Sequence, residues 1–164
     1  MSRENLIALL GSLGERIDAD MTLDAEDHTL LQVDGRIDLA ISFDEDTRSV
    51  LMVAKCGHLP TGNLQSLLLE VLAANFHWAG TGGATLAVDP HERTLHLQFR
   101  EPTDQLDEDR LQLLLAAIVQ NARKWADRLE TGHWTGEPSF ETEAPGGNAL
   151  DAMSGFPSVS MIRI

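Results

Sequence analysis

The sequence has few cysteines, few cations and no long apolar run. Among its 164 residues Cys56 is the single cysteine, so no internal disulfide can form. Twelve Lys and Arg stand against 26 Asp and Glu, which gives a formal net charge of −14. The phosphate backbone of nucleic acids and an anionic membrane surface both repel such a chain. We therefore expect it to bind neither nucleic acid nor membrane surfaces.

The absence of a long apolar stretch also limits where the protein can reside. No segment approaches the roughly 20 apolar residues that a membrane-spanning helix needs. The first residues, Met1–Asn5, lack the basic region and apolar run of a signal peptide. We therefore expect a cytoplasmic protein with no membrane insertion. A hydrophobic content of 43% is enough for one compact domain with its own core.

The spacing of apolar residues predicts three helices. The first is capped by Ser2 and ends at Gly14, the second runs from Pro60 to about Ala79, and the third runs from about Leu106 to Glu130. The second helix carries apolar residues outside its main stripe. It is therefore apolar around much of its circumference.

Five short segments between these helices alternate or are rich in β-formers, as strands are. The third has apolar side chains on both faces, because Val50 and Met52 point one way while Leu51 and Val53 point the other. The predicted fold class is α+β: one antiparallel sheet of about five strands with three helices, in the order α-β-β-β-α-β-β-α. The predicted strands are Thr29–Val33, Asp38–Asp44, Ser49–Cys56, Ala84–Asp89 and Thr94–Arg100.

The chain divides into one domain and a tail. Residues 1–130 carry all of the predicted helices and strands. Residues 131–164 are rich in Gly, Pro and acidic residues, and they show no helical or strand period. This segment is predicted to be a flexible or docked tail, and its last residues, Val159–Ile164, are again apolar.

Three motifs resemble chemical sites but lack the features that such sites need. Asp18–Thr29 alternates like a calcium loop, yet it has neither the Gly nor the final Glu of that loop. Gly80–Gly83 follows a helix, whereas phosphate loops precede one. Cys56-Gly57-His58 has no second ligand pair for zinc. We therefore predict no catalytic residue, no metal site and no cofactor.

The stretch from Leu67 to Leu129, together with the order of elements over residues 1–130, resembles the class I type III secretion chaperones. This family is typified by the chaperone of the Tir effector. The segments that carry the resemblance are Leu67–Phe76 (LLLEVLAANF), Thr81–Asp89 (TGGATLAVD), Leu95-His96-Leu97, and Leu106-Asp107 leading to Ala122-Arg123-Lys124-Trp125.

The resemblance implies a homodimer and a protein partner. Dimerisation in this family uses the second helix and nearby strands, which here implicates Leu68, Leu69, Leu72, Ala73 and Phe76. An extended N-terminal segment of an effector binds to apolar patches on the first helix and first three strands. The corresponding residues, of which we expect about half to be buried in the free dimer, are Ile7, Leu10, Leu31, Val33, Leu39, Ile41, Val50 and Met52.

The implied function is that of a cytoplasmic chaperone. It would keep one or more type III effectors soluble and competent for export, without enzymatic activity, and the secretion-system ATPase is a further candidate partner. Two alternatives remain open. A regulatory protein-binding module can have the same fold. A small-ligand-binding domain would need a closed pocket with converging polar groups, which the sequence does not supply.

Overall fold

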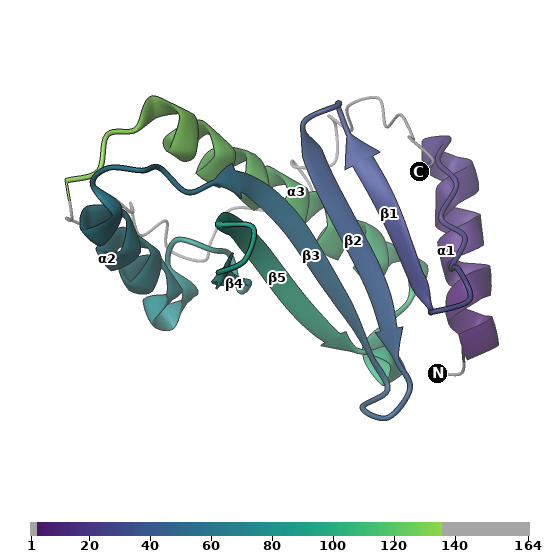
Figure 1. Ribbon diagram of the computed structural model, residues 1–164. Helices are drawn as coiled ribbons and strands as arrows, with labels where there is room; N and C mark the ends of the chain where they lie inside the picture. Colours follow the sequence, from purple (N-terminus) through teal and green to yellow (C-terminus); the bar gives the residue numbers. More distant parts are fainter. Residues whose placement is uncertain (1–2, 136–164) are drawn as a thin grey trace.

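The structure, a computed structural model, describes residues 3–135 (Figure 1). It confirms the predicted α+β class and the predicted order of elements. The elements are α1 (Arg3–Ile17), β1 (His28–Val33), β2 (Ile37–Asp44), β3 (Ser49–His58), α2 (Leu64–Asn75), the 3-10 turn η1 (Phe76–Trp78), β4 (Thr85–Asp89), β5 (Thr94–Pro102), the 3-10 turn η2 (Thr103–Gln105) and α3 (Glu108–Thr131).

All five strands belong to one antiparallel sheet with the order β1-β2-β3-β5-β4. The first hairpin turns at Asp34-Gly35, where both residues have positive φ (52° and 64°), and the Arg36 N–H closes the turn by donating to the Val33 carbonyl at 3.0 Å. After β3 the chain passes through α2 and returns by β4. Strand β5 therefore lies between β3 and β4.

One face of the sheet is covered by helix. Strand β2 alternates between buried and half-buried residues along its whole length. Helix α3 lies behind the sheet in Figure 1 and packs on β2, β3 and β5, while α1 packs against α3 beyond β1. Trp125 of α3 and Leu6 and Leu10 of α1 are among the most buried side chains of the shared core.

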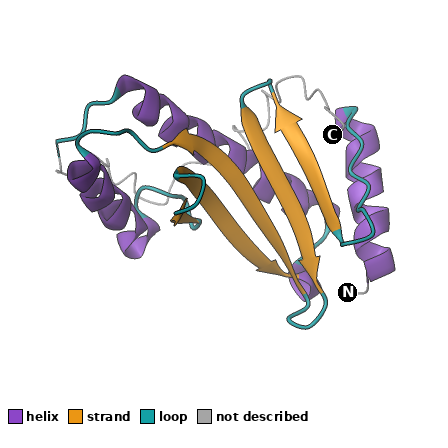
Figure 2. Ribbon diagram, in the orientation of Figure 1, coloured by secondary structure: helices purple, strands orange, loops and turns teal. Residues whose placement is uncertain are grey.

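The opposite face of the sheet has no such cover. Within residues 3–135 no helix crosses it, and Figure 2 shows the strands lying open toward the viewer, with α2 at one end and α1 at the other. Apolar side chains on this face are half-buried or exposed. The two apolar faces of β3 therefore have different surroundings.

Two helix ends differ from the prediction. Gly14 was expected to end the first helix, but α1 continues to Ile17. A Cβ at Gly14 would lie 2.4 Å from the carbonyl oxygen of Ala19, so glycine allows the chain to fold back closely after the helix. Helix α2 ends at Asn75 rather than near Ala79, and the next three residues form η1.

The packed part of the chain extends beyond the predicted boundary at residue 130. Helix α3 ends at Thr131 and is followed by Gly132, whose φ of 67° is typical of a glycine helix cap. Trp134 is buried, with only 6% of its surface exposed. Residues 136–164 lie outside the described residues, so the flexible or docked tail stays a prediction for that segment, as does docking of Val159–Ile164.

Candidate protein-binding surfaces

One side of α2 and the turn after it present large apolar side chains to solvent. Leu69 is 50% exposed, Leu72 66%, Phe76 70% and Trp78 55%. We call these four residues the α2 face. They are four of the six large hydrophobic residues that are exposed among residues 3–135. Such a concentration on a protein with a well-covered core is typical of a protein interface.

The other side of α2 fixes the orientation of this face. Leu67, Val71 and Ala74 are buried against the core. Asn75 at the end of the helix pairs with β4 twice: its Nδ2 donates to the carbonyl of Leu86 at 3.1 Å, and its Oδ1 accepts from the Leu86 N–H at 2.9 Å. These contacts hold α2 at the β4 end of the sheet with its apolar face outward.

The residues predicted for dimerisation mostly lie on this side. Leu69, Leu72 and Phe76 are exposed, while Leu68 and Ala73 are half-buried. Their role in dimerisation stays a prediction. Trp78 was not among the residues predicted for dimerisation, although it lay within the predicted helix, and in the structure it belongs to η1. His77 and Trp78 both have positive φ (52° and 54°), a strained conformation for residues with side chains.

The residues predicted to bind an effector lie largely in the core. The expectation that about half of them would be exposed is wrong. Only Ile7 is partly exposed, because the covered face of the sheet and the inner side of α1 hold the rest. A bound polypeptide cannot contact these side chains unless the core opens. The seven buried residues are Leu10, Leu31, Val33, Leu39, Ile41, Val50 and Met52.

The uncovered side of the sheet carries a smaller apolar surface. Leu30 is 41% exposed, and Ala40, Leu51 and Val53 are half-buried. Leu30 pairs with Ala40 and Ala40 pairs with Val53, so these side chains form a row across β1, β2 and β3. We call these four residues the open sheet face. The sequence distinguishes the two faces of β3, but it does not show which one is covered.

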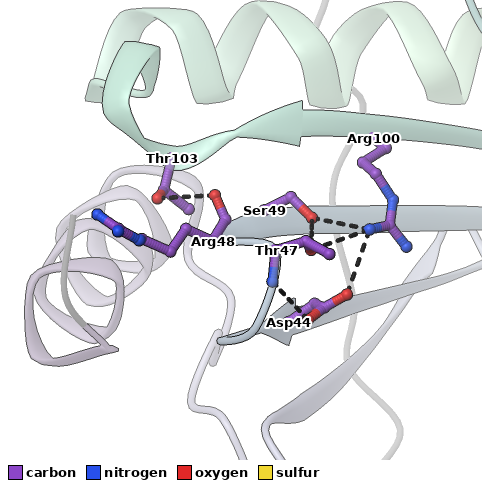
Figure 3. Close-up of polar contacts among 6 residues, drawn as sticks. All are labelled: Asp44, Thr47, Arg48, Ser49, Arg100 and Thr103. Atoms are coloured by element: carbon purple, nitrogen blue, oxygen red, sulfur yellow. Dashed lines mark hydrogen bonds and ion pairs between the residues drawn. The ribbon is translucent and has the colours of Figure 1, made fainter.

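A polar cluster borders this face at the β2–β3 turn (Figure 3). Arg100 reaches from β5, and its Nη1 donates to Asp44 Oδ2 at 3.2 Å, Thr47 Oγ1 at 3.0 Å and Ser49 Oγ at 3.1 Å. Next to it, the hydroxyl of Thr103 donates to the carbonyl of Arg48 at 3.0 Å. The turn is therefore tied to the strand beside it.

An open hollow of about 500 Å³ lies at this border. Hydrogen bonds from the Thr47 side chain and backbone, with a smaller contribution from Arg100, hold the pKa of Asp44 below its ordinary value of 3.8. Asp44 is therefore ionised at neutral pH. The hollow combines charged, polar and apolar groups from four strands, β1, β2, β3 and β5, and from the turn. It is lined by His28, Ser42, Phe43, Asp44, Glu45, Asp46, Leu51 and Arg100.

Residues of the motifs that resembled chemical sites have structural roles here. Burial raises the pKa of the Cys56 thiol to about 12, which keeps it protonated at the end of β3. Asp20 Oδ1 accepts bonds from the backbone and hydroxyl of Thr22. Gly80–Gly83 is a turn ahead of β4. Among the described residues, no group of three or more His, Cys, Asp or Glu side chains could hold a metal ion.

His96 lies half-buried on β5. Burial, and then the nearby Lys55, lower its pKa from 6.5. Its Nε2 lies 2.7 Å from Thr94 Oγ1. The ring is therefore mostly neutral at pH 7 and contributes to the sheet surface without adding charge. No helix within residues 3–135 has both the length and the apolar content to cross a membrane.

Comparison with solved structures finds the same fold in proteins of low sequence identity. The ExsC-ExsE complex contains a chain with a TM-score of 0.69 and 19% identity, over 79% of this chain and 97% of that one. The HopA1-SchA chaperone-effector complex gives 0.63 and 18%, over 77% and 98%. The ExoU-SpcU complex from the type III secretion system of Pseudomonas aeruginosa gives 0.60 and 20%, over 77% and 98%.

Sequence comparison identifies the family directly. No curated protein matches the chain significantly. The model of the Tir chaperone protein (CesT) family, however, matches residues 8–126, which is well over half of the chain. That range runs from α1 to the last third of α3 and includes both the α2 face and the open sheet face. The chain therefore belongs to the Tir chaperone protein (CesT) family.

Proposed function

We propose that this protein is a type III secretion chaperone that binds an extended N-terminal segment of one or more effectors on its open sheet face. The observation that carries this proposal is the apolar row across β1, β2 and β3 on a sheet whose other face packs against α3. Solved members of the same fold occur in chaperone-effector complexes.

The open sheet face suits an extended polypeptide. Leu30 and Val53 leave apolar surface in solvent, and covering it releases about 25 cal/mol per Å². A segment without globular structure can follow the row and place alternate side chains on it. The charge of −14 keeps the protein soluble while this surface is exposed. The effector would therefore be held without being folded.

We propose further that the protein is a homodimer joined through the α2 face. Leu69, Leu72 and Phe76 are more exposed than an isolated soluble chain favours, and they come from α2 and the turn that directly follows it. A two-fold axis near α2 would bring the same residues of two copies into contact. The open sheet faces of both copies would then stay available to one effector segment.

The proposed chaperone function also bears on the compartment, the enzymatic activity and the further partners of the protein. We propose that the protein acts in the cytoplasm without enzymatic activity, because its function is to bind a polypeptide. The secretion-system ATPase is a further proposed partner. We assign no surface within residues 3–135 to that contact.

The proposal is tested by coexpression with candidate secreted proteins. Each candidate is produced as an N-terminal segment of about 100 residues and, separately, as the remaining chain. Stable soluble complexes with an N-terminal segment, and none with the remaining chain, would support the proposal. A protein that binds no secreted segment, but binds a small ligand or folded regulator, would contradict it.

A further inference from the structure

We propose that the end of α3 and the residues after it form a clamp that fixes α2 and thereby positions the α2 face. The clamp consists of Glu70 on α2, Arg128 on α3, and Trp134 and Thr135 beyond α3. Its role in holding α2 is independent of oligomeric state. Its effect on assembly rests on the homodimer proposed above.

Glu70 is the centre of the clamp. It lies on the inner side of α2, and only 1% of its surface is exposed. Its carboxylate accepts a hydrogen bond from Arg128 Nη2, and its Oε1 accepts another from the Thr135 N–H at 3.0 Å. A carboxylate so deeply buried is costly unless it is paired and hydrogen-bonded. Loss of either donor therefore disfavours the observed position of α2.

The guanidinium of Arg128 lies over two indole rings. It lies 5.6 Å from the ring centroid of Trp125 and 5.5 Å from that of Trp134. Both distances are within the range of cation–π attraction, which strengthens when the cation is removed from water. Trp134 therefore fixes the charged group that binds Glu70.

The clamp also reaches the beginning of α2. Asn63 Nδ2 donates to the carbonyl of Trp134 at 3.0 Å. Asn63 has a φ of 56° and makes no side-chain cap with the helix, so its amide is directed to Trp134 instead. Helix α2 is thus held by this segment at its start and at Glu70, and by β4 at Asn75.

The clamp lies partly outside the range that the family model matches. The family match covers residues 8–126 and stops before Arg128 and Trp134. Arg128 and Thr135, which donate hydrogen bonds to Glu70, therefore both lie beyond the matched range.

Because the exposed residues of the α2 face lie on one short helix and its following turn, they move together. A small rotation of α2 would misalign Leu69, Leu72 and Phe76 at once. We therefore infer that Trp134 and Arg128 are positioning residues for the interface, although neither belongs to the α2 face.

Four variants of the full-length chain test this. Trp134→Ala removes the ring, Trp134→Phe keeps an aromatic ring, and Arg128→Lys keeps the charge but loses the planar group. Asp34→Asn is the matched control, because Asp34 pairs with Arg123 of α3 at a site that does not involve α2. Hydrogen exchange is measured over residues 64–75 and over β2 and β3, and the dimer dissociation constant by analytical ultracentrifugation.

We expect Trp134→Ala to speed exchange in residues 64–75 by about tenfold or more, without changing β2 or β3. Trp134→Phe should restore most of the protection, and Asp34→Asn should have no effect there. The dimer should weaken by about tenfold in Trp134→Ala. Unchanged exchange in α2, or an equal increase throughout the sheet, would overturn the proposal.

If Trp134→Ala does not fold, the test uses Arg128→Lys instead. Hydrogen exchange in residues 64–75 is then compared with exchange in β2 and β3 in the same way. If the wild type is a monomer, the homodimer proposal fails and the assembly effect of the clamp fails with it. In that case the rate of hydrogen exchange in α2 still tests whether the clamp holds the helix.

Discussion

Replacing Leu72 by Ser should dissociate the dimer while leaving the fold intact. Leu72 is 66% exposed, so two-thirds of its surface is available to a second copy. Full burial of a leucine side chain contributes about 1.5–3 kcal/mol, so burial of the exposed two-thirds of Leu72 contributes about 1–2 kcal/mol. A two-fold dimer contains the residue twice, so the loss is about 2–4 kcal/mol. The dissociation constant should rise by roughly 30- to 1000-fold.

Sedimentation equilibrium measures the dissociation constant, and urea unfolding measures stability. A substitution at an exposed position changes the stability of the monomer by about 0.5 kcal/mol or less. The free energy of unfolding of the Leu72→Ser monomer should therefore match that of the wild-type monomer. Leu113→Ser is the matched control, because Leu113 is 40% exposed on α3 and does not belong to the α2 face. A Leu72→Ser dimer as tight as wild type, or equal dissociation by Leu113→Ser, would refute the reasoning.

Two further predictions follow from the shifted pKa values. The Cys56 thiol, buried and with its pKa raised to about 12, should react with a thiol reagent at pH 8 only when the protein is unfolded, and rapid reaction of the native protein would contradict this. Asp44 has a lowered pKa, so its ionised form stabilises the fold above its ordinary value of 3.8, and this contribution is lost as the pH falls through the folded-state value. Asp44→Asn should therefore be less stable than wild type at pH 7, and the difference should vanish in strong acid. A constant difference from pH 7 to pH 2.5 in urea titrations would show that the charge is not the cause.

The order and type of elements could be predicted because they depend on local patterns. Strand β2 alternates along its whole length, and the Asp34-Gly35 turn joins it to β1 as expected. The side of the sheet that α3 covers could not be predicted in the same way. Val50 and Leu51 are both apolar, and only the path of the chain after β5 determines which one is buried. The predicted effector-binding residues were therefore placed on the covered face.

The details of α2 depend on contacts between distant parts of the chain. An apolar period continues beyond Asn75, which is why the helix was predicted to reach Ala79. It ends earlier because Asn75 bonds to Leu86 of β4. Glu70 stands within an apolar run, and its partner Arg128 lies 58 residues further along. Neither pairing leaves a signal in the local sequence.

The most direct test of the central claim compares the two faces of β3. Once an effector segment is identified, its affinity is measured by calorimetry for the double variant Leu51→Ser, Val53→Ser and for Met52→Ala. The double variant should lose about 2 kcal/mol of binding, roughly 30-fold, with little change in stability. Met52 is fully buried, so Met52→Ala should lose about 2–5 kcal/mol of stability while the folded protein binds normally. Wild-type affinity in the double variant would contradict effector binding on the open sheet face.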